Sequence, residues 1–333
     1  MQKKGIHLYS GGLDSLLSAK LLIDQGIELI GLHFILPFLA PDYDPETSHS
    51  AELARRIGLK LRYIRCAEEY MEMAKNPPHG FGKQMNPCID CHIFFLRKAA
   101  QIMEEEGAAF VSTGEVLGQR PMSQMKHMLN HIINETELKG RLLRPLSAKL
   151  LPETDAEKEG IVDRSLLLDI NGRGRDRQIS LAEGWGIHDY APPAGGCLFT
   201  DPHIATRIED LYTRTPDFSM LDVYLLSVGR HFKLGDKTTF IVPRREAETD
   251  ALEKHKESAD LYMYSDFPGP CVYVRGPYAE DDITLLASFI ARYGKPDRGP
   301  TDLIFVMKKG QSAGEIHCPP PAPESLIDSM RIS

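Results

Sequence analysis

The stretch Ser10-Gly11-Gly12-Leu13-Asp14-Ser15 stands between a short apolar segment, residues 5–9, and a longer segment, residues 15–25. The first segment is typical of a β-strand and the second of an α-helix. Two adjacent glycines between them let the backbone approach an anion, and the helix N-terminus supplies free N–H groups and a favourable dipole. Ser10 and Ser15 add hydroxyl donors, and Asp14 adds a carboxylate that can hold Mg²⁺ or orient other groups. This stretch therefore predicts a phosphate-binding loop at the start of an α/β domain.

The segments that follow this loop continue the alternation of strands and helices. Residues 27–34 form a nearly continuous apolar run, which is typical of a parallel strand covered on both faces. Asn86 and Pro87 predict the cap and the first position of a long helix that ends near Gly107. The further expected elements are a helix at 52–57 and strands at 61–66 and 109–113. This order predicts an α/β fold with a doubly wound parallel sheet.

The character of the sequence changes near residue 200. Strands are expected at 221–226, 238–242, 271–275 and 303–307, with a helix at 280–293. These elements predict a smaller C-terminal α+β domain. We therefore expect a nucleotide-binding domain at 1–200, a linker at 201–220, a second domain at 221–309 and an extended tail at 310–333.

Composition limits the class of protein. The 333 residues are 42% hydrophobic and 26% charged, as in ordinary soluble two-domain proteins, and no apolar run is long enough to span a membrane. The chain enters a strand at once, which leaves no room for a signal peptide, and six scattered cysteines predict reduced thiols in the cytoplasm. The net charge of -8 argues against a broad nucleic-acid-coating surface but leaves local basic patches at 139–149 and 173–177.

The glycine loop resembles the PP-loop, S-G-G-x-D-S, of the ATP pyrophosphatase family. Neither a Walker sequence ending in Gly-Lys-Ser/Thr nor the dinucleotide fingerprint G-x-G-x-x-G is present at this turn. The resemblance implies that ATP is cut between its α and β phosphates and that a substrate oxygen is adenylated. It implies ATP contacts at Ser10, Gly11, Gly12, Asp14 and Ser15, and we interpret Asp14 as a catalytic residue too.

Three cysteines suggest sulfur chemistry. Cys88 and Cys91 lie three residues apart at the start of the long helix, so both thiols can point from one face, and the helix N-terminus should lower the pKa of both. Together with Cys197 they can hold a 4Fe–4S cluster that keeps one iron open for hydrosulfide. Three alternatives remain: a persulfide on Cys197 resolved by Cys88 or Cys91, a zinc site completed by His92, or an inert pair with an unrelated cysteine.

A second resemblance narrows the family. Residues 112–119, STGEVLGQ, look like the T-G-E-x-L-G-Q segment of the tRNA 4-thiouridine synthetases. The C-x-x-C followed much later by G-G-C is similar to the pattern in iron–sulfur-dependent tRNA thiolases and 2-thiouridylases. The resemblance implies ATP contacts at Gly114, Gly118 and Gln119, and phosphate or RNA contacts at Arg120 and Ser123. The THUMP extension and the rhodanese domain usual in 4-thiouridine synthetases are not evident, so we expect free sulfide or an external persulfide carrier as sulfur donor.

The C-terminal part resembles the RNA-binding domain of the NFACT proteins. The matching stretches are VGRH at 228–231, ADLYMY at 259–264 and PGPCV at 268–272, with departures at His231, Tyr264 and the Pro270-Cys271 pair. The resemblance implies RNA as a partner. We expect Arg230 and Lys233 to contact phosphate and Tyr262 or Tyr264 to stack on a base, although either tyrosine alone is as well explained as a core residue of a strand.

Together these features predict an ATP-dependent tRNA uridine thiolase. The expected cofactors are ATP, Mg²⁺ and a 4Fe–4S cluster, the expected partner is tRNA, and the modified ring position, 2 or 4, stays open. The catalytic set is Asp14 with Cys88, Cys91 and Cys197, and the three cysteines are also the expected metal ligands. We expect no membrane association, and a homodimer is one assembly left open. The alternatives are a PP-loop amide-forming ligase, a thiouracil desulfidase and a non-catalytic RNA-binding factor.

Overall fold

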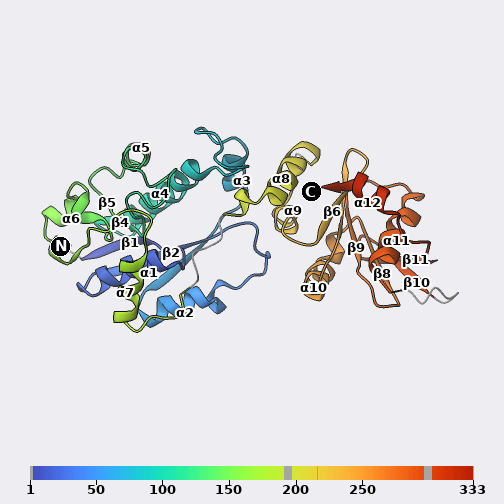
Figure 1. The fold of residues 1–333 in the computed structure, drawn as a ribbon, viewed down its shortest axis with the longest axis horizontal. Helices are drawn as coiled ribbons and strands as arrows, with labels where there is room; N and C mark the ends of the chain where they lie inside the picture. Colours follow the sequence, from blue (N-terminus) through green and yellow to red (C-terminus); the bar gives the residue numbers. More distant parts are fainter. Residues whose placement is uncertain (1–2, 191–196, 216, 296–301, 333) are drawn as a thin grey trace. The chain divides into compact units, whose positions relative to one another are not determined.

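The computed structural model describes residues 3–190, 197–215, 217–295 and 302–332. The chain divides into two compact units, Met1–Phe199 and Thr200–Ser333. Each unit is built around a sheet of its own (Figure 1). No helix in the described part of the chain is both long and apolar enough to cross a membrane.

The first unit has a five-stranded parallel sheet with the order β3-β2-β1-β4-β5. The strands are β1 (Lys4–Leu8), β2 (Glu28–Ile35), β3 (Lys60–Arg65), β4 (Phe110–Thr113) and β5 (Leu142–Leu143). The chain moves outward from β1 first on one side, to β2 and β3, and then on the other, to β4 and β5. The carboxyl ends of β1 and β4 therefore form the switch point at which doubly wound sheets bind ligands. This topology confirms the expected fold class.

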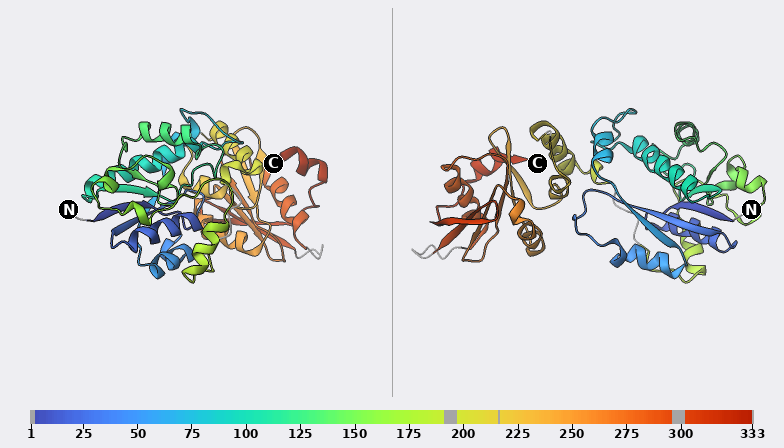
Figure 2. Two further views of the ribbon diagram at one scale, coloured as in Figure 1. Left: turned by 60° about the vertical axis from the view of Figure 1, so that its left-hand side comes forward. Right: turned by 180° about the vertical axis from the view of Figure 1, so that it is seen from behind.

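Helices cover both faces of this sheet (Figure 1). One layer contains α1 (Leu13–Ile23), α2 (His49–Arg56) and α7 (Asp176–Gly184), and the other contains α4 (Cys88–Glu105) and α5 (Lys126–Glu135). Figure 2 shows the same two layers from behind. The remaining helices are α3 (Glu68–Lys75), α6 (Asp155–Lys158) and the short 3₁₀ helices Pro45–Thr47, Ala148–Leu150, Arg164–Leu166 and Leu198–Thr200.

Helix α4 shows how the pattern of apolar residues produces this packing. Ile93, Leu96 and Ala99 recur at helical spacing, and all three are buried against Ile6 and Leu32 of the sheet. Burying a side chain of the size of Leu or Ile contributes roughly 1.5–3 kcal/mol. The helix begins at Cys88, with Pro87 at the cap position and no side-chain cap, so the expectation of an Asn86 cap is wrong. The apolar stripe, rather than a cap, places this helix on the sheet.

The second unit has a seven-stranded antiparallel sheet with the order β11-β10-β8-β9-β7-β6-β12. Its strands are β6 (Arg230–Leu234), β7 (Thr238–Val242), β8 (Leu261–Ser265), β9 (Val272–Arg275), β10 (Leu303–Lys308), β11 (Gln311–His317) and β12 (Arg331–Ile332). Its helices are α8 (Pro202–Arg214), α9 (Met220–Leu225), α10 (Glu246–Lys254), α11 (Asp282–Tyr293), α12 (Glu324–Met330) and the 3₁₀ helix Lys256–Ser258. This arrangement confirms a smaller α+β domain.

The structure corrects the expected linker at 201–220 and the expected strand at 221–226. Residues 202–214 form α8, and its buried Arg207 donates to the carbonyl oxygens of Leu226 and Gly229 at 2.6 and 3.1 Å. Residues 220–225 form α9 because Ser219 and Asp222 make a capping box that starts a helix. Alternating apolar residues in this segment suggested a strand, and the cap decides for the helix.

The expected extended tail at 310–333 is also wrong in the structure. Residues 311–317 pair with β10 as strand β11, and residues 324–330 form α12. Ile327 of α12 is buried in the core of the second unit. The prolines after Cys318 interrupt regular structure only between β11 and α12. Beyond them the chain is ordered because its apolar residues are buried in the core of the second unit.

Candidate functional site

The predicted phosphate loop joins β1 to α1 at the switch point. Gly11 takes a positive φ of 80°, and a Cβ at this position would lie 2.5 Å from the Cβ of Ser50, so only glycine fits. The Ser15 hydroxyl donates to the carbonyl of Gly12 at 2.8 Å and accepts from the backbone N–H of Ser10 at 3.3 Å. No side chain caps α1, whose cap residue is Gly12. The amides of its first turn therefore remain available to an anion.

Asp14 is the centre of a polar group that the sequence placed only in part. Its Oδ2 accepts hydrogen bonds from Gln119 Nε2 at 3.0 Å and from Arg175 Nη2 at 2.8 Å. Its Oδ1, together with Gln119 Oε1 and Arg175 Nε, is buried without a hydrogen-bond partner. Gln119, expected to contact ATP directly, thus lies against Asp14. These unpartnered polar atoms leave donors and acceptors for a ligand or an ion at this point.

Arg175 is a functional candidate that the motifs missed. The sequence offered it only as one member of a basic patch with Arg173 and Arg177, because 161 positions separate it from Asp14 in the chain. It directly precedes α7, which packs on the same face of the sheet as α1. A guanidinium held by a carboxylate at a phosphate loop is well suited to hold a phosphate oxygen.

The segment after β4 closes the site from the other side of the switch point. A Cβ on Gly114 would lie 2.5 Å from the backbone nitrogen of Ser15, so this glycine allows the two segments to touch. Gly118 takes a positive φ of 75°, and its N–H donates to the carbonyl of Gln124 at 2.7 Å. Both residues therefore shape the backbone around the phosphate loop.

His7 fixes β1, β4 and α1 to one another. Its Nε2 lies 2.9 Å from the carbonyl oxygen of Ser15, and its Nδ1 lies 2.9 Å from Ser112 Oγ. Burial lowers the pKa of His7 to about 4, against the opposing effect of the Ser15 carbonyl. The neutral ring is thus a structural bridge beneath the phosphate loop.

The structure brings the three predicted cysteines into one region of the first unit. Cys91 on α4 interacts electrostatically with both Cys197 and Cys88, and its Sγ lies 3.0 Å from the hydroxyl of Tyr70. All three thiols are partly buried and none forms a disulfide. The glycines at 195 and 196, which precede Cys197 in the motif, lie outside the described residues.

The three thiols differ in acidity. Burial acts to raise the pKa of Cys88, but its hydrogen bond with His92, assisted by Ser123 and Arg120, lowers that pKa overall. Burial raises the pKa of Cys91 and that of Cys197. The expectation that the pKa of both Cys88 and Cys91 is lowered is therefore wrong for Cys91, because burial outweighs the hydrogen bond with Tyr70. Cys88 is therefore the most acidic thiol of this set.

A series of ionic contacts surrounds His92, the partner that lowers the pKa of Cys88. His92 Nδ1 lies 3.0 Å from Glu115 Oε1, and Arg144 Nε donates to Glu115 Oε2 at 2.8 Å. Burial opposes protonation of His92, but the hydrogen bonds with Cys88 and Glu115 raise its pKa to about 9. Burial likewise acts to raise the pKa of Glu115, and Arg144 and His92 together hold it well below its usual range. The sequence analysis named His92 only as a possible zinc ligand, and Glu115 only as part of the T-G-E-x-L-G-Q segment. Neither was predicted to influence the acidity of a cysteine.

The residues expected to contact RNA occupy different environments. Arg120 is exposed and acts electrostatically on Cys88 and Cys197, so it belongs to the thiol region. In the second unit, the Arg230 guanidinium lies 4.5 Å from the ring centre of Tyr293 and donates to the carbonyl of Pro243 at 3.1 Å. Lys233 is exposed on β6. Its side chain is thus accessible to a phosphate.

The two candidate tyrosines separate into a core residue and a surface residue. Tyr262 is 3% exposed, whereas Tyr264 is 40% exposed and lies 5.1 Å, between ring centres, from Phe305 on β10. His231 is buried with its Nε2 3.0 Å from two carbonyl oxygens, those of Leu225 and Val228. Tyr264 is therefore the accessible aromatic of the pair, and His231 is structural.

A doubly wound parallel sheet with an uncapped glycine loop at its switch point is an arrangement in which such folds bind phosphate-bearing ligands. Residues 1–162 match the sequence model of the family described as thiamine biosynthesis protein (ThiI), and residues 229–329 match that of the NFACT protein RNA binding domain. The first unit is thus similar in sequence to the ThiI family, and the second to the NFACT RNA-binding domain. These two matches confirm the resemblances to the tRNA thiouridine synthetases and to the RNA-binding domain of the NFACT proteins.

Curated relatives match part of the chain. The chain is 31% identical over 147 residues to a tRNA-specific 2-thiouridylase, MnmA, of Proteus mirabilis, a match that covers 41% of this chain and 40% of the relative. It is 24% identical over 211 residues to a probable tRNA sulfurtransferase of Methanothermobacter thermautotrophicus, covering 62% of this chain and 46% of the relative. The chain thus spans less than half the length of these relatives.

Two solved structures show partial similarity. A 4-thiouridine synthetase–RNA complex with bound ATP aligns with a TM-score of 0.37 at 21% identity, over 60% of this chain and 45% of the other. The U34-tRNA thiolase NcsA from Methanococcus maripaludis, solved with its 4Fe–4S cluster, aligns with a TM-score of 0.34 at 17% identity, over 67% of this chain and 68% of the other.

Proposed function

We propose that this protein is an ATP-dependent tRNA sulfurtransferase that replaces a carbonyl oxygen of a uridine by sulfur. One observation supports this most directly. Gly114 touches the phosphate loop at Ser15, and the next residue, Glu115, contacts His92, which in turn hydrogen-bonds to Cys88. Two adjacent residues thus join the nucleotide half of the site to the thiol half. That connection is what an enzyme needs if it activates an oxygen with ATP and then delivers sulfur to the same carbon.

In the first step, the uracil carbonyl oxygen attacks the α-phosphorus of ATP and pyrophosphate leaves. The first-turn amides of α1 and the Arg175 guanidinium stabilise the negative charge that develops on the phosphates. Asp14 orients Arg175 through Oδ2. Its Oδ1, buried and without a partner, fits a Mg²⁺ ion, which when bound would neutralise phosphate charge.

In the second step, hydrosulfide adds to the activated carbon and AMP leaves with the former carbonyl oxygen. In sum, uridine, ATP and hydrosulfide give thiouridine, AMP and pyrophosphate. Protonated His92 lowers the pKa of Cys88 and so favours its thiolate form. Cys88, Cys91 and Cys197 fit a 4Fe–4S cluster as three thiolate ligands, and such a cluster would offer an open iron for hydrosulfide. The lowered pKa of Cys88 also suits a persulfide route, in which Cys88 would resolve a persulfide on Cys197.

The second unit is proposed to bind the RNA. The exposed ring of Tyr264 is placed to stack on a base, and Lys233 and Arg230 are basic groups for the backbone. We propose tRNA as the substrate and an external sulfide or persulfide carrier as the sulfur donor. A homodimer is part of the same proposal. So does a cytoplasmic location, in which the free thiols would stay reduced.

The decisive experiment supplies tRNA from a thiolation-deficient strain to protein reconstituted anaerobically with iron and sulfide. We expect thiouridine, quantified by mass spectrometry of digested tRNA, to depend on ATP and to disappear in Cys197→Ala. Cys318→Ser, which alters a cysteine of the second unit, should keep full activity. No thiouridine in the complete reaction would overturn the proposal. Full activity of the Cys88→Ala, Cys91→Ala and Cys197→Ala triple variant on an amine acceptor would favour an amide-forming ligase, and loss of sulfur from thiouracil without ATP would favour a desulfidase.

A second experiment separates nucleotide activation from sulfur delivery. Arg175→Ala should lower tRNA-dependent pyrophosphate release by ~10²–10³-fold, the cost typical of losing one preorganised charge-stabilising donor. Arg173→Ala, which removes an arginine of the same basic run, is the matched control and should leave the rate unchanged. Equal rates for the two variants would contradict the role assigned to Arg175. Iron measured per chain in both variants should equal that of the wild type.

A further inference from the structure

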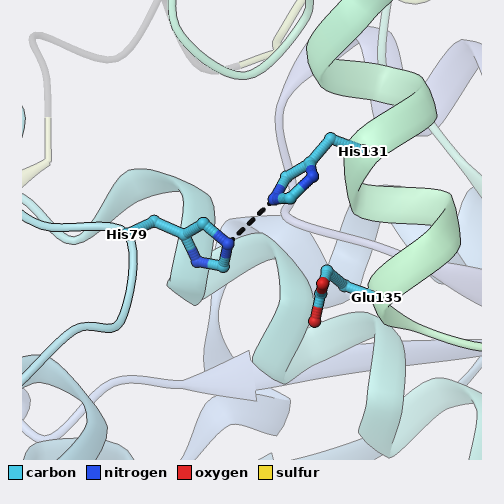
Figure 3. A group of neighbouring side chains, drawn as sticks. All are labelled: His79, His131 and Glu135. Atoms are coloured by element: carbon cyan, nitrogen blue, oxygen red, sulfur yellow. Dashed lines mark hydrogen bonds between the residues drawn. The ribbon is translucent and has the colours of Figure 1, made fainter.

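A second group of metal-ligand side chains lies outside the residues assigned to sulfur transfer. His79, His131 and Glu135 have ligand atoms within 4.8 Å of one another, and no other such group occurs among residues 3–190, 197–215, 217–295 and 302–332 (Figure 3). His79 belongs to the segment between α3 and α4. His131 and Glu135 lie on α5 at positions i and i+4, so both side chains leave the same face of the helix. Two separate elements thus meet at this point.

A buried carboxylate orients one of these histidines. Asp90 is 4% exposed; its Oδ1 lies 2.7 Å from His79 Nδ1, and its Oδ2 accepts the backbone N–H of His79 at 3.1 Å. An ionised carboxylate can only accept, so this contact favours the neutral tautomer of His79 in which Nδ1 donates and Nε2 carries the lone pair. That Nε2 faces His131 Nε2 at a distance of 2.8 Å (Figure 3). A carboxylate behind a metal-binding imidazole is the usual outer partner of such ligands.

The third side chain completes a mixed nitrogen and oxygen donor set. The Glu135 carboxylate is 41% exposed, and its oxygen Oε2 lies 3.4 Å from Arg97 Nη2. The shorter contacts of Arg97, at 2.9 and 3.1 Å, go to the backbone carbonyl of Glu135. Arg97 is therefore held mainly by the backbone, and the carboxylate stays available to a cation.

We propose that His79, His131 and Glu135 bind a first-row transition-metal ion of the Zn²⁺ type, with water or an external ligand in the fourth position. Two imidazoles and one carboxylate match the ligands that Zn²⁺ accepts, whereas Mg²⁺ and Ca²⁺ prefer oxygen donors alone. The ion would tie the segment at 76–87 to α5. Because Asp90 lies between Cys88 and Cys91 on α4, this tie acts on the segment that leads directly into the thiol helix. The proposal does not depend on the proposed sulfur transfer.

Cobalt is a suitable probe because its spectrum reports the ligands. The test uses the full chain with Cys88, Cys91 and Cys197 replaced by alanine, so that the thiolates of the other site do not bind the ion. We expect Co²⁺ to bind one ion per chain, with visible d–d bands and no near-ultraviolet sulfur-to-cobalt charge transfer, and Zn²⁺ to displace it. The absence of stoichiometric binding, or a sulfur charge-transfer band, would overturn the proposal.

Substitutions in the same background locate the site. His131→Asn should weaken Zn²⁺ binding by ~100-fold or more, and Asp90→Asn by ~10–100-fold, as expected for an outer carboxylate. His127→Asn is the matched control, since His127 is exposed on the same helix outside the group, and it should bind as the parent does. Circular dichroism checks that each variant is folded. Unchanged affinity in folded His131→Asn would refute the assignment. Hydrogen exchange at 76–87 should slow when Zn²⁺ is added and should not slow in His131→Asn.

Discussion

Two buried histidines, His231 in the second unit and His92 in the first, show how neighbouring groups set the charge of a buried imidazole. Burial lowers the pKa of His231 to about 3, and the nearby Arg207 adds to this effect, so the ring is neutral between two carbonyl oxygens. Burial acts in the same direction on His92, yet Cys88 and Glu115 raise its pKa to about 9. The second unit uses its histidine as a structural hydrogen-bond donor, whereas the first unit keeps a charge beside a thiol. The difference lies in the anionic partners, not in the degree of burial.

Removing the charge of Glu115 is expected to have the largest effect on the stability of the first unit. Glu115→Gln leaves Arg144, whose side chain is 2% exposed, without its ionic partner. Breaking a buried ion pair in this way costs about 3–5 kcal/mol of unfolding free energy, to be measured by urea denaturation. Glu104→Gln removes the exposed partner of Arg141 and should cost less than about 1 kcal/mol. Similar losses in the two variants would contradict the buried ionic series.

His231→Phe tests the structural histidine and has a smaller expected effect. The change leaves two carbonyl oxygens without their donor and should cost about 1–3 kcal/mol near pH 7. The folded-state pKa of His231 lies below its ordinary value of 6.5, so wild type loses stability as pH falls through this window towards about 3. The gap between wild type and variant should therefore close below pH 6.5.

His92 predicts a pH dependence of the opposite sign. Its folded-state pKa of about 9 exceeds the ordinary 6.5, so its stabilisation is complete below 6.5 and is lost as pH rises through about 9. Unfolding measured from pH 5 to pH 10 on wild type, His231→Phe and His92→Gln should show both trends. Parallel pH profiles for the two variants would mean that the histidines do not differ as described.

The smallest expected effect concerns the reactivity of Cys88. His92→Gln removes the partner that lowers the Cys88 pKa, so the thiolate fraction at pH 7 and with it the alkylation rate should fall. The measurement is the rate of alkylation by iodoacetamide, resolved for each cysteine by peptide mass spectrometry. His127→Gln is the control with an exposed histidine on α5. Equal Cys88 rates in the two variants would remove His92 from the thiol site.

Much of the fold follows from local patterns. The strand at 5–9, the glycine loop and the helix after it sit where the sequence put them, within one or two residues. The errors at 201–226 and 310–333 arose where a capping box or a distant core decided the outcome. The sequence shows that Ile327 is apolar. Only the tertiary structure shows that it is buried in the core of the second unit.

The sequence by itself determined the glycine loop between β1 and α1, because adjacent glycines between a strand and a helix allow a tight turn without any distant partner. It also singled out Cys88, Cys91 and Cys197 as residue types. The tertiary structure alone decided which groups surround them: Arg175 reaches Asp14 across 161 positions, and Glu115 is the residue that His92 contacts. Charges act through space on neighbours that the chain order does not reveal. The acidity of Cys88 was therefore decided only by the fold.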